Sequence, residues 1–567
     1  MTVRLHPSPT TLRRLAGVSQ GREPADLVLT GGALLNVFTE EVQEGWGVAV
    51  ADGRVAFVGP DVDVAARSGE DTELIELGGD LVAPGLIEGH THLTRIRVSD
   101  YADAQVAAGV TTTVVECMEF AAVAGPPGVR ELLAEAEGVS GRLFYTLSGL
   151  IVVDPEQDAG LGSEDWVQLL DHPRVAGVGE VYWADLLRGH RRSEALIAAA
   201  LERSLPVEGH GAGARPAALN AIAASGIGSD HESITAEDSL ARLRLGLRAE
   251  ARHGATRQDL PALAALWREL RVDLGRLSLV TDGVEPEVLA RGESLNSVVD
   301  LAVELGLPLP RAVRLASRNV AEGLGLGRWL GGLGPAMLAD LVVLPAGAGF
   351  RPRRVLVGGR PPVPSPPSRY PAWVHDLVRV KGLRPELLVR PGPGRWRAME
   401  LVAPLVTREV ESDGSDALVC ACVDRLGGER GFRGLLHGFG LRGGGVALSS
   451  GWESAGLVVV GDRSEDMAVA ARRVADNHGG VAVVSEGRVL AEWRAPVAGL
   501  YGSGPLAEVV SEVSAVNGAL ATLGCPWPNG ILSLEVLTTA AIPFLRIAPS
   551  GYRRLRDGAQ LGLEWEP

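Results

Sequence analysis

From about residue 81 to about residue 330, short apolar runs alternate with stretches rich in alanine, leucine, arginine and glutamate, and no other feature constrains the fold as much. Short apolar runs predict buried strands, and the stretches between them predict helices. Strands that alternate with helices build parallel sheets. We expect strands at residues 81–87, 111–116, 142–147, 175–181, 206–210, 227–233 and 277–282, and helices at residues 239–254 and 260–270.

Seven or more of these strand–helix units fit between residues 81 and 330. A (β/α)₈ barrel typically needs about 250 residues, so the length and the alternation together predict a TIM-like barrel. A doubly wound open sheet is the alternative arrangement. The fold class that we predict is α/β: a (β/α)₈ barrel with a small composite β-domain and a C-terminal mixed α/β domain.

The segments on either side of this region have a different pattern. Short β-rich runs occupy residues 26–80, where Asp52-Gly53 marks a hairpin. Residues 338–360 return to β character and repeat the opening pattern, so we expect them to rejoin the first strands. We predict a β-domain at 1–80 completed by 335–360, a barrel at 81–334, a proline-rich linker at 361–372 and a C-terminal domain at 373–567.

Charge and composition exclude several classes of partner. The net charge is −16, so the chain lacks the clustered basic charge that a nucleic acid or an anionic membrane requires. We find no apolar run near the roughly 20 residues of a membrane span and no signal peptide, and we expect a cytoplasmic protein. The four cysteines are too few for a disulfide framework, so packing is their expected role. A small-molecule substrate stays open.

A His-x-His pair, His90 and His92, follows the apolar run at the end of the first predicted barrel strand. Alternate residues of a strand point to the same face, so both imidazoles can reach one metal ion. Such a pair also arises by chance. Its position strengthens it, because barrel enzymes collect their catalytic groups at the carboxyl ends of the strands.

Four further groups end later apolar runs in the same way. Each has an ordinary alternative: a carboxylate there can cap a helix, and a histidine beside glycines can be a turn residue. Their joint occurrence at strand ends of one repeating region is a much rarer accident. They predict a site for one or two divalent metal ions together with the His-x-His pair. These groups are Glu180, His210, His231 and Asp282.

The stretch PGLIEGHTHL, the later carboxylate, the two separate histidines and the final Thr-Asp resemble the amidohydrolase superfamily. Within it, four segments resemble the adenine deaminase family, and the resemblance extends over nearly the whole chain. These segments are residues 226–247, 278–292, 338–344 and 497–513.

The resemblance implies a role for each group at the strand ends. His90 and His92 would bind one metal ion, His210 and His231 a second, Glu180 would bridge the two, and Asp282 would be the remaining ligand and the proton shuttle. The implied cofactors are two divalent ions, manganese or iron, with zinc as the alternative. A homo-oligomer is also implied.

The lysine content supports the bridging role of Glu180. Many superfamily members bridge their metals with a carboxylated lysine, but the only lysine in this chain is Lys381, outside the predicted barrel. A carboxylate must therefore take that place.

The implied activity is hydrolytic deamination of adenine, or of a related aminopurine or amino-heterocycle, to the oxo product and ammonia. The nucleophile would be a hydroxide held by metal ions that lower the pKa of bound water to roughly 7, and Asp282 would transfer the proton. The alternatives are hydrolysis of a cyclic amide or another C–N bond, an inactive paralogue, and a non-catalytic binding protein.

Several positions depart from the family pattern, which favours a hydrolase with an altered pocket. Thr94-Arg95-Ile96 replaces Glu-Ser-Ser, and the C-terminal His-Asp-Ser-His reads Trp452 to Ala455. Arg95, Glu119 and Glu232 are the candidate substrate contacts. Arg95 could instead form a salt bridge with Glu116 or Glu119.

Overall fold

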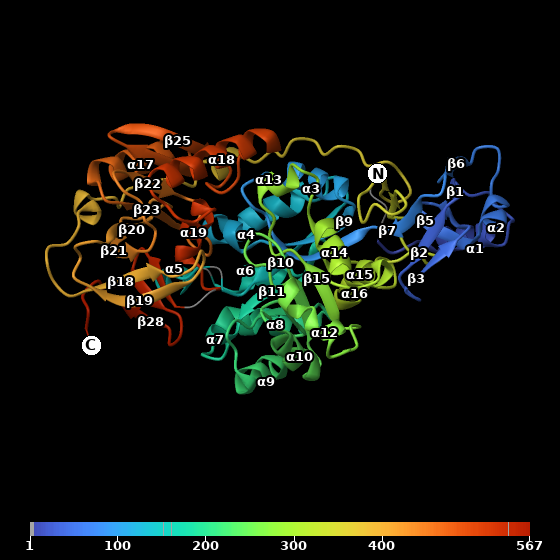
Figure 1. Ribbon diagram of the computed structural model, residues 1–567, viewed down its shortest axis with the longest axis horizontal. Helices are drawn as coiled ribbons and strands as arrows, with labels where there is room; N and C mark the ends of the chain where they lie inside the picture. Colours follow the sequence, from blue (N-terminus) through green and yellow to red (C-terminus); the bar gives the residue numbers. More distant parts are fainter. Residues whose placement is uncertain (1–4, 151, 160–161, 542–543, 567) are drawn as a thin grey trace.

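Eight parallel strands form the central sheet of the computed structural model, which describes residues 5–150, 152–159, 162–541 and 544–566 (Figure 1). Each strand pairs with the next one in the chain. The Asp282 amide donates to the His90 carbonyl at 3.2 Å, which joins the last strand to the first and closes the sheet. The predicted barrel is therefore confirmed, and the alternative of a doubly wound open sheet is wrong. Its strands are β8 (Leu86–His92), β9 (Val110–Glu116), β10 (Arg142–Ser148), β11 (Val175–Tyr182), β12 (Val207–His210), β13 (Ser229–Asp230), β14 (Arg248–Arg252) and β15 (Leu277–Val280).

Helices surround these strands (Figure 1). The apolar face of α14, with Leu295 and Val299, shares a buried cluster with Leu277 of β15 and Ala249 of β14. Burial of this helical face holds the helix on the barrel. The helices are α3 (Val98–Ala107), α4 (Met118–Glu135), α5 (Pro155–Ala159), α6 (Glu164–Leu169), α7 (Trp183–Leu186), α8 (Arg191–Glu202), α9 (Pro216–Ala224), α10 (Ala236–Arg244), α11 (Leu260–Leu263), α12 (Ala265–Arg268), α13 (Pro286–Leu289), α14 (Leu295–Glu304), α15 (Leu309–Leu315) and α16 (Arg318–Gly323).

The predicted helix over residues 239–254 is wrong in its second half. Helix α10 ends at Arg244, and Gly246 adopts the left-handed conformation (φ 80°) that commonly follows a helix end. The chain then enters β14, which pairs with β13 and β15. The sequence of this strand favours a helix, but its place between two barrel strands overrides that preference.

Two other predicted elements are divided. The strand expected at 81–87 breaks at Gly85 into β7 (Leu81–Pro84) and β8. A Cβ atom at Gly85 would lie 2.2 Å from the Thr111 hydroxyl oxygen, so only glycine fits this junction. The helix expected at 260–270 is the pair α11 and α12.

Two small sheets lie together on one side of the barrel (Figure 1). In the first, the order is β5-β4-β1-β6, and in the second it is β17-β16-β7-β2-β3. Strand β16 runs antiparallel to β7, so a segment from the second half of the chain completes the second sheet. The domain boundaries stay a prediction. The elements are α1 (Pro9–Ser19), β1 (Leu27–Thr30), β2 (Ala33–Asn36), β3 (Glu41–Glu44), β4 (Trp46–Ala51), β5 (Arg54–Pro60), α2 (Asp61–Ala65), β6 (Glu73–Glu76), β16 (Leu341–Leu344) and β17 (Arg354–Leu356).

After residues 361–371, which contain no helix or strand, the chain forms a mixed sheet in the order β19-β18-β21-β20-β23-β22-β24-β25. Cys420 and Cys422 lie buried on one face of β20 and are free, as expected for packing residues. The strands are β18 (Trp396–Leu401), β19 (Thr407–Ser412), β20 (Leu418–Asp424), β21 (Gly431–His437), β22 (Gly445–Leu448), β23 (Gly456–Gly461), β24 (Gly480–Ser485) and β25 (Arg488–Arg494).

Helices of different lengths and a three-stranded sheet complete this C-terminal part. No helix among the described residues is long and apolar enough to cross a membrane. The remaining elements are η1 (Ala372–Asp376), η2 (Pro385–Leu388), α17 (Ser464–Asp476), α18 (Leu506–Thr522), α19 (Gly530–Glu535), η3 (Val536–Thr538), β26 (Leu545–Ala548), β27 (Gly551–Arg554) and β28 (Ala559–Leu561).

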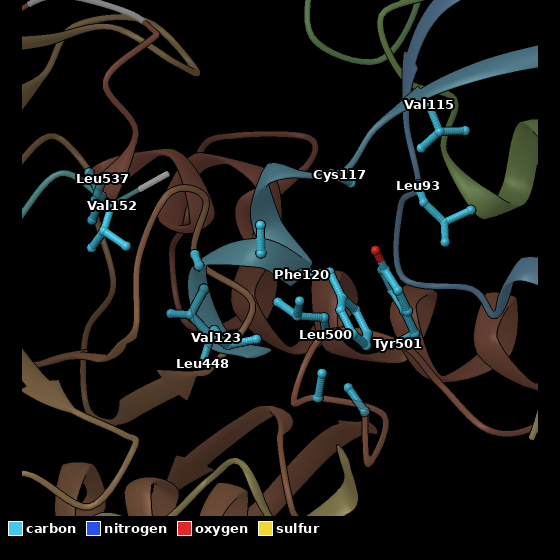
Figure 2. Packing of buried hydrophobic residues seen from close by; sticks show 14 of the residues in the cluster. Leu93, Val115, Cys117, Phe120, Val123, Val152, Leu448, Leu500, Tyr501 and Leu537 are labelled. Atoms are coloured by element: carbon cyan, nitrogen blue, oxygen red, sulfur yellow. The ribbon is translucent and has the colours of Figure 1, made fainter. Parts of the chain in front are cut away.

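The C-terminal part packs against the end of the barrel where β8 and β9 finish. Figure 2 shows Phe120 of α4 beside Tyr501 of the C-terminal part, and their rings stack with centroids 5.7 Å apart. Leu93 and Leu500 belong to the same buried cluster, and the Gly502 amide donates to the Arg95 carbonyl at 2.8 Å. The two parts therefore share one core at the carboxyl ends of the barrel strands.

Candidate active site

Four imidazoles surround one oxygen of Glu180 at the carboxyl ends of the barrel strands. The distances from Glu180 Oε1 are 3.5 Å to His90 Nε2, 3.4 Å to His92 Nε2, 3.6 Å to His210 Nδ1 and 3.4 Å to His231 Nε2. Each of the five side chains is at most 5% exposed. Four imidazoles from three strand ends, those of β8, β12 and β13, thus converge on one carboxylate of β11.

Asp282, which follows β15, completes this cluster. Its Oδ1 lies 3.2 Å from His90 Nε2 and 3.3 Å from His92 Nε2. Its Oδ2 accepts hydrogen bonds from Thr256 at 2.6 Å and from Arg252 at 2.9 Å. One oxygen of Asp282 is therefore fixed by the protein while the other faces the imidazoles. The structure brings all six predicted metal-site groups together.

The second nitrogen of each imidazole has an acceptor that fixes the ring. Glu208 Oε1 lies 2.9 Å from His90 Nδ1 and 2.8 Å from His231 Nδ1. Glu119 Oε1 lies 2.7 Å from His92 Nδ1, and the Ala541 carbonyl oxygen lies 2.7 Å from His210 Nε2. An outer acceptor of this kind leaves a lone pair on the inner nitrogen, as in carboxylate–histidine–metal arrangements.

These residues fit a metal centre. His92 Nε2 is buried and has no hydrogen-bond partner among the described residues. An imidazole nitrogen that is desolvated without a partner is costly unless an ion takes the place of water. Geometric groupings within the cluster, such as His90, His92, Glu180 and Asp282, could each hold an ion.

The electrostatics of the cluster favour positive charge. Burial by itself would lower the pKa of His210, but the nearby carboxylates of Glu232 and Glu180 raise it to about 9. Burial would raise the pKa of Asp282, yet the Arg252 charge and the adjacent imidazoles of His90 and His92 hold it well below its usual value. Carboxylates that remain ionised attract cations, and together with imidazole nitrogens they can bind divalent metal ions.

Unusual backbone conformations occur at the same place. Glu180, Asp282 and Arg95 have φ values of 42°, 55° and 59°, in the left-handed region that non-glycine residues seldom adopt. Glu453 of the C-terminal part has φ 43°. Residues in such conformations cluster at functional sites, where the surrounding structure holds them.

A cavity of about 280 Å³ opens onto the cluster. Glu180, His210 and Asp282 line it together with Glu232, one of the predicted substrate contacts. Glu232 also forms an ion pair with Arg252. The C-terminal part supplies one wall, which consists of Val406, Trp452 and Ala541.

Trp452 covers His92. The two rings are stacked with centroids 4.8 Å apart and an interplanar angle of 26°. Glu119, another predicted substrate contact, instead accepts from His92 on the outer side of that ring. This places Glu119 behind a presumed metal ligand, and Trp452 beside the space where a substrate would lie.

Arg95 is buried and forms two ion pairs, with the partly buried Glu285 and with the buried Glu535 of α19. The predicted salt bridge with Glu116 or Glu119 is wrong in its partners. Arg95 lies beyond the end of β8 with a left-handed backbone, so strand alternation no longer indicates the direction of its side chain. Its role as a substrate contact stays a prediction.

Other residues of the site were missed from the sequence. Glu208 precedes His210 by two residues on β12, and Tyr182 follows Glu180 by two residues on β11, so strand alternation could have indicated both. Arg252 lies on a strand that was read as a helix. The contacts of Glu453 and Ala541 come from loops of the C-terminal part, for which the sequence carries no comparable signal.

Known proteins resemble this chain over most of its length. Residues 397–558 match the family model described as the adenine deaminase C-terminal domain. The adenine deaminase of Moorella thermoacetica is 33% identical, with 96% of both chains covered, and that of Cenarchaeum symbiosum is 30% identical, with 96% of this chain and 94% of the other covered. A solved structure of N-acetylglucosamine-6-phosphate deacetylase from Pasteurella multocida is 14% identical with a TM-score of 0.46, over 59% of this chain and 98% of the other.

Proposed function

We propose a function for this chain from the premise that it belongs to the adenine deaminase family. The chain is a hydrolase acting on C–N bonds. Its proposed reaction is the hydrolytic deamination of adenine, in which water replaces the exocyclic amino group and ammonia leaves. A homo-oligomeric state and a cytoplasmic location stay predictions from the sequence.

One observation carries this proposal above the others. Glu180, Asp282 and four histidines converge at a cavity, and each imidazole has its outer nitrogen fixed by an acceptor. In the proposed centre, His90 and His92 would hold one divalent ion, His210 and His231 would hold a second, and Glu180 would contribute to both. We propose manganese or iron as these ions. When bound, they would lower the pKa of coordinated water toward roughly 7 and so provide a nucleophile.

Asp282 is placed to move the proton. Its Oδ2 is held by Arg252 and Thr256, so its Oδ1 stays directed toward the imidazoles and the cavity. In the proposed reaction Oδ1 accepts the proton of the attacking water and then delivers it to the leaving amine nitrogen. General acid–base transfer by a group fixed in this way contributes about 10²- to 10⁴-fold in rate.

The cavity wall supports an aromatic substrate. Trp452 presents a ring at the edge of the space above the cluster, and aromatic rings associate by offset stacking or edge-to-face contact. The ring of adenine could be held there while its amino-bearing carbon faces Asp282. The side chains of Arg95 and Glu119 already have partners in the protein: Arg95 forms ion pairs, and Glu119 holds His92. We therefore assign the substrate contact to Trp452 before these two residues.

Ammonia release tests the proposal directly. The purified protein, loaded with Mn²⁺ or Fe²⁺, should release ammonia from adenine or a related aminopurine. The His90→Ala variant, prepared in the same way, is the control for contaminating activity. If the loaded protein releases no ammonia from any aminopurine, the proposal is wrong; opening of a cyclic amide without ammonia would favour the alternative C–N hydrolase.

A further inference from the structure

Glu453 is a buried acid of the C-terminal part that reaches into the barrel. It lies between β22 and β23, and its side chain is fully buried. Its carbonyl accepts a hydrogen bond from the Val153 amide at 2.9 Å, so the barrel also fixes its backbone. A buried carboxylate on a left-handed backbone (φ 43°) is costly to maintain, which points to a functional reason for it.

The carboxylate of Glu453 contacts the hydroxyl of Tyr182 on β11. The same hydroxyl donates to Glu180 Oε2 at 2.7 Å. Tyr182 thus lies between two carboxylates, one from each part of the molecule. Glu180 Oε1, on the other side of that carboxylate, is the atom that the four imidazoles surround.

A proton count defines the direction of these hydrogen bonds. A tyrosine hydroxyl donates one proton and can accept another. Glu180 is an acceptor when ionised, so Tyr182 donates to it. The contact between Tyr182 and Glu453 is then a hydrogen bond when the Glu453 carboxyl carries a proton and donates it to the Tyr182 oxygen. Burial, followed by the charge of Glu180, raises the pKa of Glu453 to about 7, so the protonated form of this carboxyl is well populated near neutral pH.

We propose that Glu453 is a positioning residue of the metal centre, which acts through Tyr182 to hold Glu180 in the orientation that directs Oε1 at the four histidines. The inference rests on the proposed function in one respect, namely that Glu180 is a metal ligand. The Ala541 carbonyl, which fixes His210, is a second contact from the same part. Through these two contacts the C-terminal part holds two of the proposed ligands, Glu180 and His210, in place.

Metal affinity of the full chain tests this inference. The variants are Glu453→Ala, Tyr182→Phe and the double variant, and the affinity for Mn²⁺ is measured by competition with a chelator. Loss of a residue that orients a ligand weakens metal binding about 10- to 100-fold. Both single variants should fall in this range, and the double variant should bind no more weakly than either, because the two residues form one chain of hydrogen bonds.

Two further variants separate positioning from general damage. Glu453→Gln keeps a side-chain N–H that can donate to the Tyr182 oxygen, so its affinity should stay close to that of the wild type. Asp466→Asn removes a buried charge of α17 that accepts from the Glu486 and Gly487 amides, remote from the centre, and should leave metal binding unchanged. Thermal melting of the metal-free proteins identifies any variant that fails to fold.

The outcomes are distinct. Unchanged metal affinity in Glu453→Ala or Tyr182→Phe, or additive losses in the double variant, would overturn the inference. A wild type that binds metal but deaminates no aminopurine overturns only the proposed function, because the affinity comparison still holds. A wild type that binds no metal overturns both.

Discussion

The barrel and the C-terminal part meet at the same cavity, but they contribute to it in different ways. All six presumed metal-site groups are in the barrel, at or just after the ends of strands. The C-terminal part contributes a covering ring (Trp452), a carbonyl that fixes His210 (Ala541), and an acid behind Tyr182 (Glu453). The predicted metal ligands thus lie in one part, and several contacts that cover or fix them come from the other.

Regular and irregular backbone explain this division. Parallel barrel strands place their carboxyl ends at one rim with a fixed spacing. Side chains at these ends therefore meet even if the conformation of the loops is not known. The C-terminal contacts come from loops, which can be placed only by packing of the two parts against each other. Variants in either part test this division.

The largest effect is expected from the barrel. His90→Ala removes a nitrogen that lies 3.2 Å from Asp282 Oδ1 and 3.5 Å from Glu180 Oε1, so it should abolish ammonia release and leave fewer than two metal ions per chain by elemental analysis. His172→Ala, outside the cluster, is the matched control and should retain both properties. Full activity in His90→Ala would contradict the assignment of the centre.

A large loss of stability is expected at the contact between the parts. Arg95 is 3% exposed and pairs with Glu285 and Glu535, so Arg95→Leu leaves one buried and one partly buried carboxylate without their cation. Removal of one partner of a buried ion pair costs about 3–5 kcal/mol. Urea unfolding should show this loss.

The variant Arg95→Leu combined with Glu285→Gln and Glu535→Gln should recover part of that stability, since no unpaired charge remains. The opposite pattern, an unchanged unfolding curve with a raised KM for adenine, would show instead that Arg95 contacts the substrate.

An intermediate effect should distinguish two acids of the barrel. Glu208 accepts from both His90 and His231, whereas Glu119 accepts from His92 alone. Within the roughly 10- to 100-fold range for such residues, Glu208→Ala should weaken Mn²⁺ binding more than Glu119→Ala does. Chelator competition measures both. Equal losses would mean that ring orientation does not control the affinity.

The smallest effect is expected at the wall. Trp452→Leu removes the ring beside the substrate space, and a lost aromatic contact of about 0.5–1.5 kcal/mol corresponds to a rise of about 2- to 10-fold in KM. Trp452→Phe, which keeps a ring, should change KM less. Steady-state kinetics with adenine check both, and a loss of metal affinity at unchanged KM would assign Trp452 to the centre instead.

The sequence predicted the barrel, which the structure confirms, and it predicted that six groups meet at one rim, because both predictions depend on regular strands. Their role as metal ligands stays a prediction. The position of His90, His92 and His210 at strand ends was enough to bring them together. Strand β14 was mistaken for a helix, since its residues favour a helix and only its neighbours make it a strand, and Arg252 was lost with it. Glu453 was recognised as part of a changed motif, but its contact with Tyr182 depends on packing between segments 271 residues apart.

The carboxylate at the middle of the four histidines has one more consequence. The glutamate at position 180 is encoded by the gene, whereas a carboxylated lysine forms only after a lysine amine has reacted with dissolved carbon dioxide. The described barrel strands contain no lysine. Every group around the cluster is therefore present as soon as the chain has folded. Metal loading in buffer stripped of bicarbonate should proceed as fast, and to the same extent, as in air-equilibrated buffer.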